Sequence, residues 1–364
     1  MSKKVIYLLH LPPPIHGSSV VGKQIMDSQV IHEGYDASFI NLSTSSTVDA
    51  IGRVSLIKLY TYLKILARLL FQLLFERPRW AYVAITVQGG AFYKDAIVVL
   101  LLRLFRVSVI FHMHNKGVLD KQDKRPYKWL YPIVFKGSRA ILLSERLYPD
   151  VARYFARNRV DICPNGIQKS CIEMEREGDL RATPSILFLS NLIRSKGIMI
   201  LLDACSILKK RGVQFECQVA GGEGDVTVSD LESQCKELGI EARVKYIGRV
   251  SGQAKVRAFQ EASIFCLPTF YHYECLPLVL IEAMQWSLPL VSTPEGGISD
   301  LVLEGQTGFV VEQQDAAALA DRLQILLCDA DLRTRMGAAA RKHYENHFTE
   351  LHFENRMREI LSEL

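Results

Sequence analysis

The sequence has no pair of cysteines at C-x2-C spacing, although its 364 residues include eight cysteines. These cysteines are scattered, and several fall within apolar stretches typical of strands or helices. Scattered single cysteines argue against a zinc site and against a disulfide framework. We therefore expect reduced, mostly buried thiols and a cytoplasmic protein.

Long uncharged apolar runs are also missing. The most apolar helical stretch, residues 53–79, is interrupted by Lys58, Lys64 and Arg68, so no 18-residue run is free of charge. A membrane-spanning helix is therefore not expected. The apolar run near the N-terminus covers only Val5 to Leu9, and for this reason we expect no signal peptide.

Charge is distributed unequally between the two halves of the chain. Residues 1–168 carry 23 Lys and Arg against 11 Asp and Glu, whereas residues 169–364 carry 21 against 28. The halves therefore have net charges of +12 and −7, which agree with the total of +5. At this length we expect two domains, each with its own core, and the asymmetry indicates that they face different partners.

The most informative stretch is residues 264–293. An apolar run ends at Leu267, and Pro277, which has no amide hydrogen, suits the first turn of a helix that runs to about Gln285. Glu274 precedes this helix and Glu282 lies within it, so their carboxylates are expected about 10 Å apart. The helix start at residues 276–278, where amide donors have no intrahelical partner, would favour a phosphate. Solvated glutamates that interact with the helix dipole remain the alternative interpretation.

This stretch, ECLPLVLIEAM, resembles the E-x7-E motif of retaining glycosyltransferases of family 4, of the bacterial cell-surface polysaccharide type. Three further segments match the family in the same order: residues 189–205, 219–225 and 296–311. The resemblance covers most of the second half of the chain, and the first half matches more weakly. It implies an α/β protein of the GT-B fold, with two Rossmann-like domains facing across a cleft.

The resemblance also implies a division of the chain. We expect an acceptor-binding domain at 1–168, a domain for the nucleotide-sugar donor at 169–345, and a C-terminal helix, 346–364, that crosses back to the first domain. The segment after Cys163, PNGI, resembles the entry to the linker between the domains in this family.

The resemblance assigns roles to residues on the donor side. Lys196 would bind the donor diphosphate, and Glu274 and Glu282 would bind the sugar and the ribose. The family usually has arginine where this chain has Asn191. Arg194, three residues later, is the candidate to replace that cation. The remaining donor-binding candidates are Cys275, where the family often has glycine, Leu276, Pro277 and Leu278.

In the first half, His114 follows an apolar strand and matches the active-site histidine of the family, whereas His112 does not. Strand C-terminal ends are where open α/β sheets bind ligands. Gly17, in the loop after the first strand, would let the backbone approach the donor. An ordinary proline-stiffened connection is the alternative for that loop.

Two segments of the first half suggest a membrane surface. Residues 53–79 form an apolar helix punctuated by cations, and residues 116–131 alternate basic and aromatic side chains. The first suits a membrane interface or the core of an α/β domain, and the second an anionic membrane, a phosphorylated glycolipid or solvent.

These observations predict a retaining transferase that moves a sugar from a nucleotide diphosphate sugar to a hydroxyl of a glycan or lipid-linked acceptor. We expect catalysis by His114, Glu274 and Lys196, no cofactor, no metal and no nucleic-acid partner, at the inner face of the cell membrane. The chain lacks a paired-aspartate metal motif, in line with a metal-independent reaction. The alternatives are a catalytically inactive glycan- or lipid-binding protein, a sugar-nucleotide 2-epimerase and an inverting transferase. The sugar, the acceptor, the catalytic base and the oligomeric state are left open.

Overall fold

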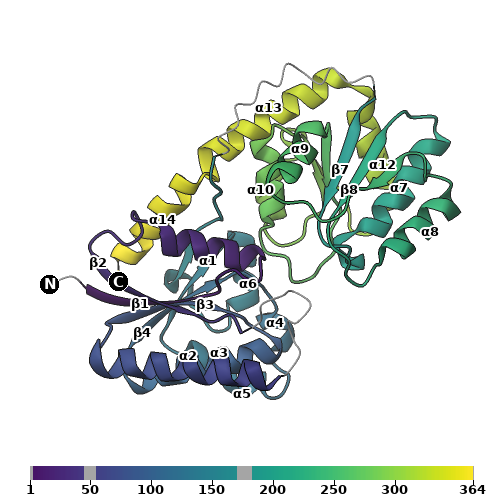
Figure 1. Cartoon of the computed structure of the whole chain (residues 1–364). Coiled ribbons are helices and arrows are strands. Elements are labelled where there is room, and N and C mark those ends of the chain that lie inside the picture. Colours follow the sequence, from purple (N-terminus) through teal and green to yellow (C-terminus); the bar gives the residue numbers. More distant parts are fainter. Residues whose placement is uncertain (1–2, 45–54, 170–182, 364) are drawn as a thin grey trace. The chain divides into compact units, whose positions relative to one another are not determined.

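The computed structural model describes residues 3–44, 55–169 and 183–363 (Figure 1). The chain forms two compact units. Unit 1 contains Met1–Asn165 together with Leu351–Leu364, and unit 2 contains Gly166–Glu350. Most of the polar segment that follows the predicted boundary, residues 170–182, lies outside the described residues.

Unit 1 is built on a parallel six-stranded sheet in the order β2-β1-β3-β4-β5-β6. Its strands are β1 (Lys3–Leu9), β2 (Tyr35–Asn41), β3 (Trp80–Ile85), β4 (Ser108–Met113), β5 (Arg139–Leu142) and β6 (Val160–Ile162). Its helices are α1 (Gly17–Asp27), α2 (Leu56–Phe75), α3 (Gly89–Leu104), α4 (Val118–Lys121), α5 (Tyr127–Phe135), α6 (Tyr148–Val151) and α14 (Glu350–Ser362), with short 3-10 turns at Glu145–Leu147 and Arg157–Arg159.

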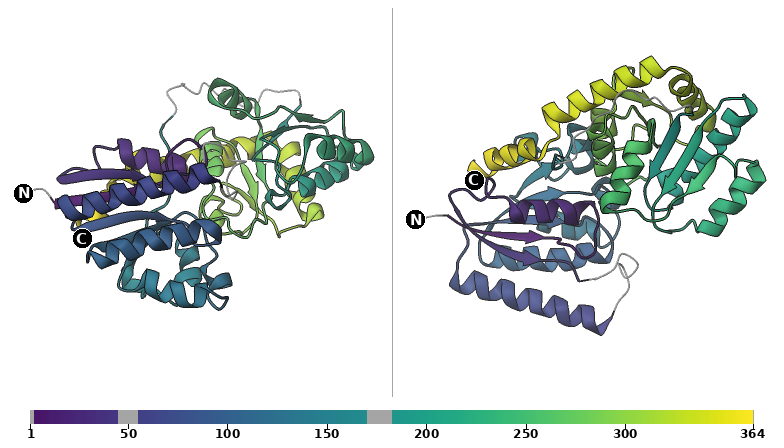
Figure 2. Two further views of the ribbon diagram at one scale, coloured as in Figure 1. Left: turned by 60° about the horizontal axis from the view of Figure 1, so that its bottom comes forward. Right: turned by 45° about the horizontal axis from the view of Figure 1, so that its top comes forward.

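Helices cover both faces of this sheet. In two views, α1 and α14 lie on one face, and α2 and α3 lie on the other (Figures 1 and 2). All six residues of β3 are buried, and Val5 to Leu9 of β1 are at most 1% exposed. Such continuous apolar strands are typical of parallel sheets that are covered on both faces.

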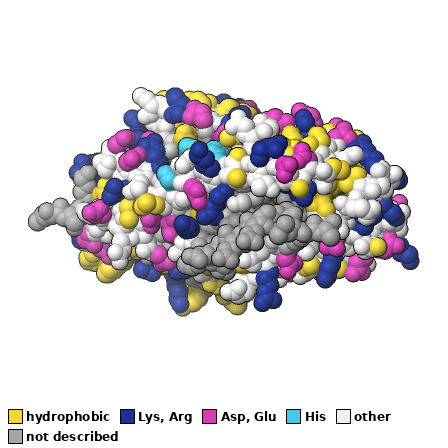
Figure 3. All heavy atoms as spheres, turned by 90° about the horizontal axis from the view of Figure 1, so that it is seen from above, with side chains coloured by type: hydrophobic (Ala, Val, Ile, Leu, Met, Phe, Trp, Pro, Cys, Tyr) yellow, Lys and Arg dark blue, Asp and Glu magenta, His cyan; other side chains and the backbone are white. Residues whose placement is uncertain are grey.

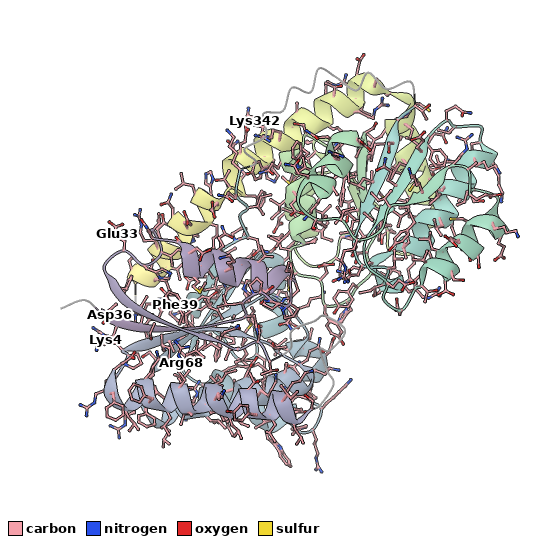
Figure 4. All side chains as sticks on the ribbon, viewed as in Figure 1. Lys4, Glu33, Asp36, Phe39, Arg68 and Lys342 are labelled. Carbon is pink, nitrogen blue, oxygen red and sulfur yellow. The ribbon has the colours of Figure 1, made fainter. Side chains whose placement is uncertain are left out.

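The C-terminal helix belongs to unit 1, as predicted. Phe353 and Met357 of α14 are buried, and the Tyr35 hydroxyl donates a hydrogen bond of 2.9 Å to the Leu361 carbonyl. Arg358 pairs with Glu33 at 3.2 Å, close to the start of β2 (Figure 4).

Unit 2 is built on a second parallel six-stranded sheet, in the order β12-β11-β10-β7-β8-β9. Its strands are β7 (Ser185–Leu189), β8 (Glu216–Ala220), β9 (Val244–Tyr246), β10 (Ile264–Leu267), β11 (Leu290–Ser292) and β12 (Gly308–Val310). Its helices are α7 (Ile198–Lys210), α8 (Val228–Leu238), α9 (Gly252–Glu261), α10 (Leu278–Gln285), α11 (Ile298–Leu301), α12 (Ala316–Cys328) and α13 (Ala330–His347), with a 3-10 turn, η3, at Arg194–Lys196.

The cysteines of the described residues are not paired in disulfides, as expected. Six of the seven are buried, and only Cys328 is exposed. Burial raises the pKa of Cys163 and Cys266, and a hydrogen bond with Cys217, followed by burial, raises the pKa of Cys205, so these thiols are held in the protonated, unreactive form.

Candidate active site

Lys196 and Glu274 form an ion pair in unit 2, although 78 residues separate them in the sequence. Lys196 ends the turn η3 that follows β7, and Glu274 lies in the loop that follows β10. Because both strands are parallel neighbours, their carboxyl ends meet at the same edge of the sheet. The two side chains are only 17% and 11% exposed, and the ammonium lies 4.6 Å from the centre of the Tyr271 ring.

Backbone contacts hold these two loops together. The Phe270 amide donates to the Ser195 carbonyl at 2.8 Å, and the Thr269 hydroxyl donates to the same oxygen at 3.3 Å. Gly197 has φ +87°, and a Cβ atom there would lie 2.0 Å from the Pro268 carbonyl oxygen. Only glycine fits this position, which explains why a glycine directly follows Lys196.

A glycine turn from the next strand supports the backbone of Glu274. Gly296 has φ +57°, and a Cβ atom there would lie 2.4 Å from the carbonyl oxygen of Glu274. The Gly297 amide donates to the carbonyl of Cys275 at 2.6 Å. The segment that begins at Gly296 therefore buttresses the candidate site.

Helix α10 begins beside Glu274. Pro277 is the N-cap rather than a residue of the first turn, so the helix starts one residue later than predicted, at Leu278. Within the described residues, the amides of Leu278 and Val279 have no hydrogen-bond partner, whereas Leu280 donates to the Pro277 carbonyl at 3.1 Å. The two amides are available to an anion such as a donor phosphate.

Glu282, in the second turn of α10, accepts a hydrogen bond of 2.6 Å from the Lys255 ammonium. Lys255 lies on α9, and its side chain and that of Glu282 are 31% and 26% exposed. The sequence analysis did not single out Lys255, since no spacing relates a residue of α9 to one of α10. A ribose diol that bound Glu282 would share or replace this lysine.

Asn191, where the family usually has arginine, and Arg194, which could replace that cation, differ in their surroundings. Asn191 accepts a weak hydrogen bond of 3.4 Å from the Gly222 amide, so it bridges the loops after β7 and β8. Arg194 is exposed, and its backbone amide donates to Asp225 at 2.6 Å. Whether Arg194 compensates for Asn191 stays a prediction.

In unit 1, His114 lies at the carboxyl end of the sheet, directly after β4, in a group of four histidines. Its ring centre is 4.1 Å from that of His112, whose Nδ1 is 2.5 Å from the Tyr82 hydroxyl. His10 and His16, in the loop after β1, have ring centres 6.2 Å apart. Burial, followed by His10 and His16, lowers the pKa of His114 to about 3, and burial lowers that of His10 to about 4. These imidazoles are therefore neutral near pH 7.

His16 also explains where α1 begins. Its Nδ1 accepts from the Ser19 amide at 3.3 Å, and its own amide donates to the Ser19 hydroxyl at 2.9 Å, which completes a capping box. The helix therefore starts at Gly17, so this glycine is the first residue of α1 and not part of the loop in which the sequence analysis placed it. Because Nδ1 accepts, the proton of neutral His16 lies on Nε2, where it can be donated.

Comparisons with known proteins place these observations in a family. Residues 173–343 match the family described as Glycosyl transferases group 1. The chain is 27% identical over 274 residues to the amylovoran biosynthesis glycosyltransferase AmsK of Erwinia amylovora, which covers 72% of this chain and 66% of AmsK. It is 30% identical over 275 residues to alpha-D-kanosaminyltransferase of Streptomyces kanamyceticus, which covers 69% of this chain and 68% of that protein. The match to D-inositol 3-phosphate glycosyltransferase of Corynebacterium efficiens spans only 38% of that relative, so the chain matches less than two thirds of the length of several relatives.

Solved structures confirm the predicted fold class. Sucrose-phosphate synthase of Thermosynechococcus elongatus superposes with a TM-score of 0.78 at 18% identity, covering 99% of this chain and 98% of that one. Anabaena HepE in complex with UDP and glucose superposes with a TM-score of 0.74 at 17% identity, covering all of both chains. The two parallel sheets with their flanking helices thus have the GT-B architecture. Together with the kanosaminyltransferase match over more than two thirds of both chains, this shows that the chain belongs to the group 1 glycosyl transferases.

Proposed function

We propose that the protein transfers a sugar from a nucleotide diphosphate sugar to a hydroxyl of a glycan or glycolipid, with retention of anomeric configuration and without a required metal. The observation that carries the proposal is the Lys196–Glu274 pair beside the start of α10. It combines a cation for the diphosphate, a carboxylate for sugar hydroxyls and two unpaired amides. The Anabaena HepE complex with UDP and glucose supports a nucleotide-sugar donor, and relatives named for amylovoran and capsular polysaccharide biosynthesis support a polysaccharide or its precursor as product.

The ion pair suggests how the donor would be bound. In the free protein Glu274 neutralises Lys196, so the site holds no uncompensated buried charge. When a diphosphate binds, the flexible ammonium can turn toward it, and Glu274 becomes available to sugar hydroxyls. The cation and the amides of Leu278 and Val279 would then stabilise the leaving diphosphate as its charge develops.

His114 would serve as a neutral hydrogen-bonding group. With a pKa of about 3 it does not act as a general acid near pH 7, because almost no imidazolium is present. It would contact the sugar or relay a proton, and the leaving phosphate would accept the proton of the acceptor hydroxyl. The expected metal independence rests on the resemblance and on the protein cations named above.

A screen of nucleotide sugars by thermal shift tests the donor, because a ligand at 100 times its dissociation constant adds about 2.7 kcal/mol of stability. The donor that stabilises the protein is then incubated with candidate acceptors, with and without a metal chelator, and the product anomer is read by NMR. We expect transfer with the anomeric configuration of the donor, unchanged by the chelator. An inverted anomer or loss of activity with the chelator contradicts the corresponding part of the proposal, and nucleotide-sugar binding without any turnover contradicts the enzymatic function.

We further propose that unit 1 binds an anionic membrane surface, where a lipid-linked acceptor would reside. Among the described residues no helix is long and apolar enough to span a bilayer. Yet 15 of the 20 exposed large apolar side chains in the described part of the chain lie on α2, α3 and α5, which points to one docking region. By contrast, on the side of unit 1 that carries α14, Lys and Arg are interspersed with Asp and Glu (Figure 3).

Helix α2 packs one apolar stripe on the sheet and leaves a second one exposed. Ile65, Leu69 and Leu73 are buried, whereas Leu56 and Leu63, which lie on the opposite face, are 84% and 54% exposed. The interior-facing interpretation therefore accounts for one face of α2, and the exposed stripe on the other face is available for the interfacial one.

Neighbouring helices extend the exposed stripe of α2. On α3, Tyr93, Ile97, Leu100 and Leu104 are exposed at intervals of three and four residues. The Tyr62 hydroxyl of α2 donates to the Lys94 carbonyl at 2.7 Å, which holds the two helices side by side. On α5, Trp129 is exposed and lies 5.2 Å from the Arg125 guanidinium. Apolar side chains flanked by cations and aromatic rings suit a lipid interface.

Vesicle flotation tests the membrane proposal. We expect the protein to float with phosphatidylglycerol vesicles, and Leu63→Gln with Leu70→Gln to weaken this binding. The matched control replaces two exposed apolar residues outside the region, Val20→Gln with Ile325→Gln, and should bind like the wild type. Equal binding by all three proteins contradicts the proposed apolar docking region.

A further inference from the structure

A cavity of about 450 Å³ lies in unit 1 at the edge of the sheet where the strands begin. Three arginines line it: Arg79 directly precedes β3, Arg139 is the first residue of β5, and Arg159 directly precedes β6. Because the strands are parallel, their amino ends share one edge, opposite to the edge that carries His114. The cavity is therefore separate from the candidate active site.

The three guanidinium groups differ in their partners. Arg139 is neutralised by Asp161 at 2.9 Å and by Glu363 at 3.1 Å, and the carboxylate of Glu363 also lines the cavity. Arg159 donates to the Gly137 carbonyl at 3.0 Å but pairs with no carboxylate in the described residues. The Arg79 side chain makes no hydrogen bond or ion pair within the same part of the chain. Arg79 and Arg159 thus have no carboxylate partner, and the three arginines together with Asp161 and Glu363 leave a net charge of +1 at the cavity.

The rest of the lining offers further donors and an apolar wall. Trp80 is 2% exposed and forms part of the wall, with its indole Nε1 shielded from solvent. Asn158 and Ser108 add polar side chains, and Val109 adds an apolar one. Arginine side chains held in fixed positions are the preferred protein ligands of phosphate groups, which they bind through two parallel hydrogen bonds.

We propose that this cavity binds a phosphate group, carried either by a soluble phosphorylated molecule or by a phospholipid head group. Two guanidinium groups without a carboxylate partner, and a net positive charge, favour an anionic ligand over a neutral one. The position of the cavity supports the phospholipid source, because the exposed Phe75 and Leu104, at the ends of α2 and α3, precede the lining residues Arg79 and Ser108 by four positions each. Binding of a phospholipid head group rests on the proposed membrane binding, whereas binding of a soluble phosphorylated molecule does not. Neither kind of binding rests on sugar transfer.

Two binding measurements on the full chain separate the sources. Calorimetry follows titration with glycerol 3-phosphate, with glycerol as the blank, and flotation uses phosphatidylcholine vesicles with and without phosphatidylglycerol. The test variant is Arg79→Gln with Arg159→Gln. The matched control is Lys4→Gln with Lys136→Gln, which removes two charges from the same edge without touching the cavity lining (Figure 4 labels Lys4). If the double variant is destabilised, the single variant Arg79→Gln replaces it in both measurements. This substitution removes no side-chain hydrogen bond or ion pair within the described residues.

We expect the arginine variant to bind at least about tenfold more weakly than the wild type and the lysine control, because charged hydrogen bonds are lost. A selective loss for glycerol 3-phosphate supports the cavity with a soluble ligand, and a selective loss confined to phosphatidylglycerol vesicles supports it with a head group. Equal weakening in both double variants, or no saturable binding by the wild type to either probe, overturns the proposal. A protein inactive in sugar transfer still gives all of these readings, so the two proposals fail independently.

Discussion

Replacing Lys196 with methionine separates the structural role of the Lys196–Glu274 pair from its proposed role in transfer. Methionine keeps most of the length of the lysine side chain and removes its charge. The variant leaves the Glu274 carboxylate, whose side chain is 11% exposed, without its cation. Stability and activity should respond differently to a second substitution, Glu274→Gln, and this difference carries the test.

The structure sets the expected cost in stability. Breaking a fully buried ion pair from one side costs about 3 to 5 kcal/mol, because a charge is left unpaired in a medium of low polarity. Here the side chains are 17% and 11% exposed, so water screens part of that charge. We expect Lys196→Met to lower the free energy of unfolding by about 1 to 3 kcal/mol. Adding Glu274→Gln removes the unpaired charge and should recover at least half of this loss.

Activity should not recover in the double variant. If Lys196 stabilises the leaving diphosphate, Lys196→Met lowers transfer by about a hundredfold or more, and a second change at the sugar-binding carboxylate cannot restore it. Stability is measured by denaturant unfolding of the wild type, the two single variants and the double variant. The kcat of each protein is measured in transfer assays with saturating donor and acceptor. Arg211→Met is the matched control, since the exposed Arg211–Asp321 pair of unit 2 should contribute at most about 1 kcal/mol.

Three results would refute this reasoning. Recovery of both stability and transfer in the double variant would mean that the pair is only structural. Transfer at the wild-type rate by Lys196→Met would remove the lysine from the diphosphate site and make Arg194 the better candidate. Loss of stability in Arg211→Met equal to that in Lys196→Met would show that partial burial of the pair has no energetic consequence.

Three further outcomes are expected. Glu282→Ala should weaken binding of the nucleoside diphosphate by about 1 to 3 kcal/mol in calorimetry if the carboxylate holds the ribose, while Glu274→Ala should leave it unchanged and reduce turnover. Burial lowers the pKa of His114 to about 3, so as pH falls from about 6.5 toward 3 the unfolded chain binds a proton that the folded protein does not. Stability should therefore fall over this range, and His114→Asn should make the fall shallower by up to about 1.4 kcal/mol per pH unit in pH-dependent unfolding; an unchanged slope contradicts the buried neutral histidine. Gly296→Ala should reduce both transfer and the melting temperature through its clash with the Glu274 carbonyl, more than Gly305→Ala, which has positive φ but open space around it.

Most strands and helices follow from patterns that act over a few residues. The buried strands are continuous apolar runs, and α8 starts and ends where its capping residues predict, at Val228 and Leu238. Strand β2 (Tyr35–Asn41) was not predicted, because it lies at the sheet edge and only Ile40 is buried. Its apolar and polar residues therefore do not alternate clearly, and its assignment depends on pairing with β1, which the local sequence does not encode.

The sequence indicated which residues to consider for the candidate site, but not which contacts they make. The resemblance to the family singled out Lys196, Glu274 and Glu282, and α/β topology then brings the loops after β7 and β10 to one sheet edge. The partner of Glu282 was missed, since Lys255 lies on a helix whose orientation is set by packing against the sheet. The same holds for His10 and His16, because only the folded sheet brings the loop after β1 close to the end of β4.

The apolar pattern of helix α2 required two interpretations. Its apolar residues occur around most of the circumference, and neither a core helix nor an interfacial helix accounts for all of them. In the folded protein Ile65, Leu69 and Leu73 pack inward, so the hydrophobic effect already explains that half of the pattern. The outward stripe, which includes Leu63, gains nothing from folding of unit 1 and exposes apolar surface that favours association. Helices α3 and α5 expose similar apolar stripes. A single surface that covers all three helices at once would account for all of these exposed side chains, and we propose that this surface is the membrane.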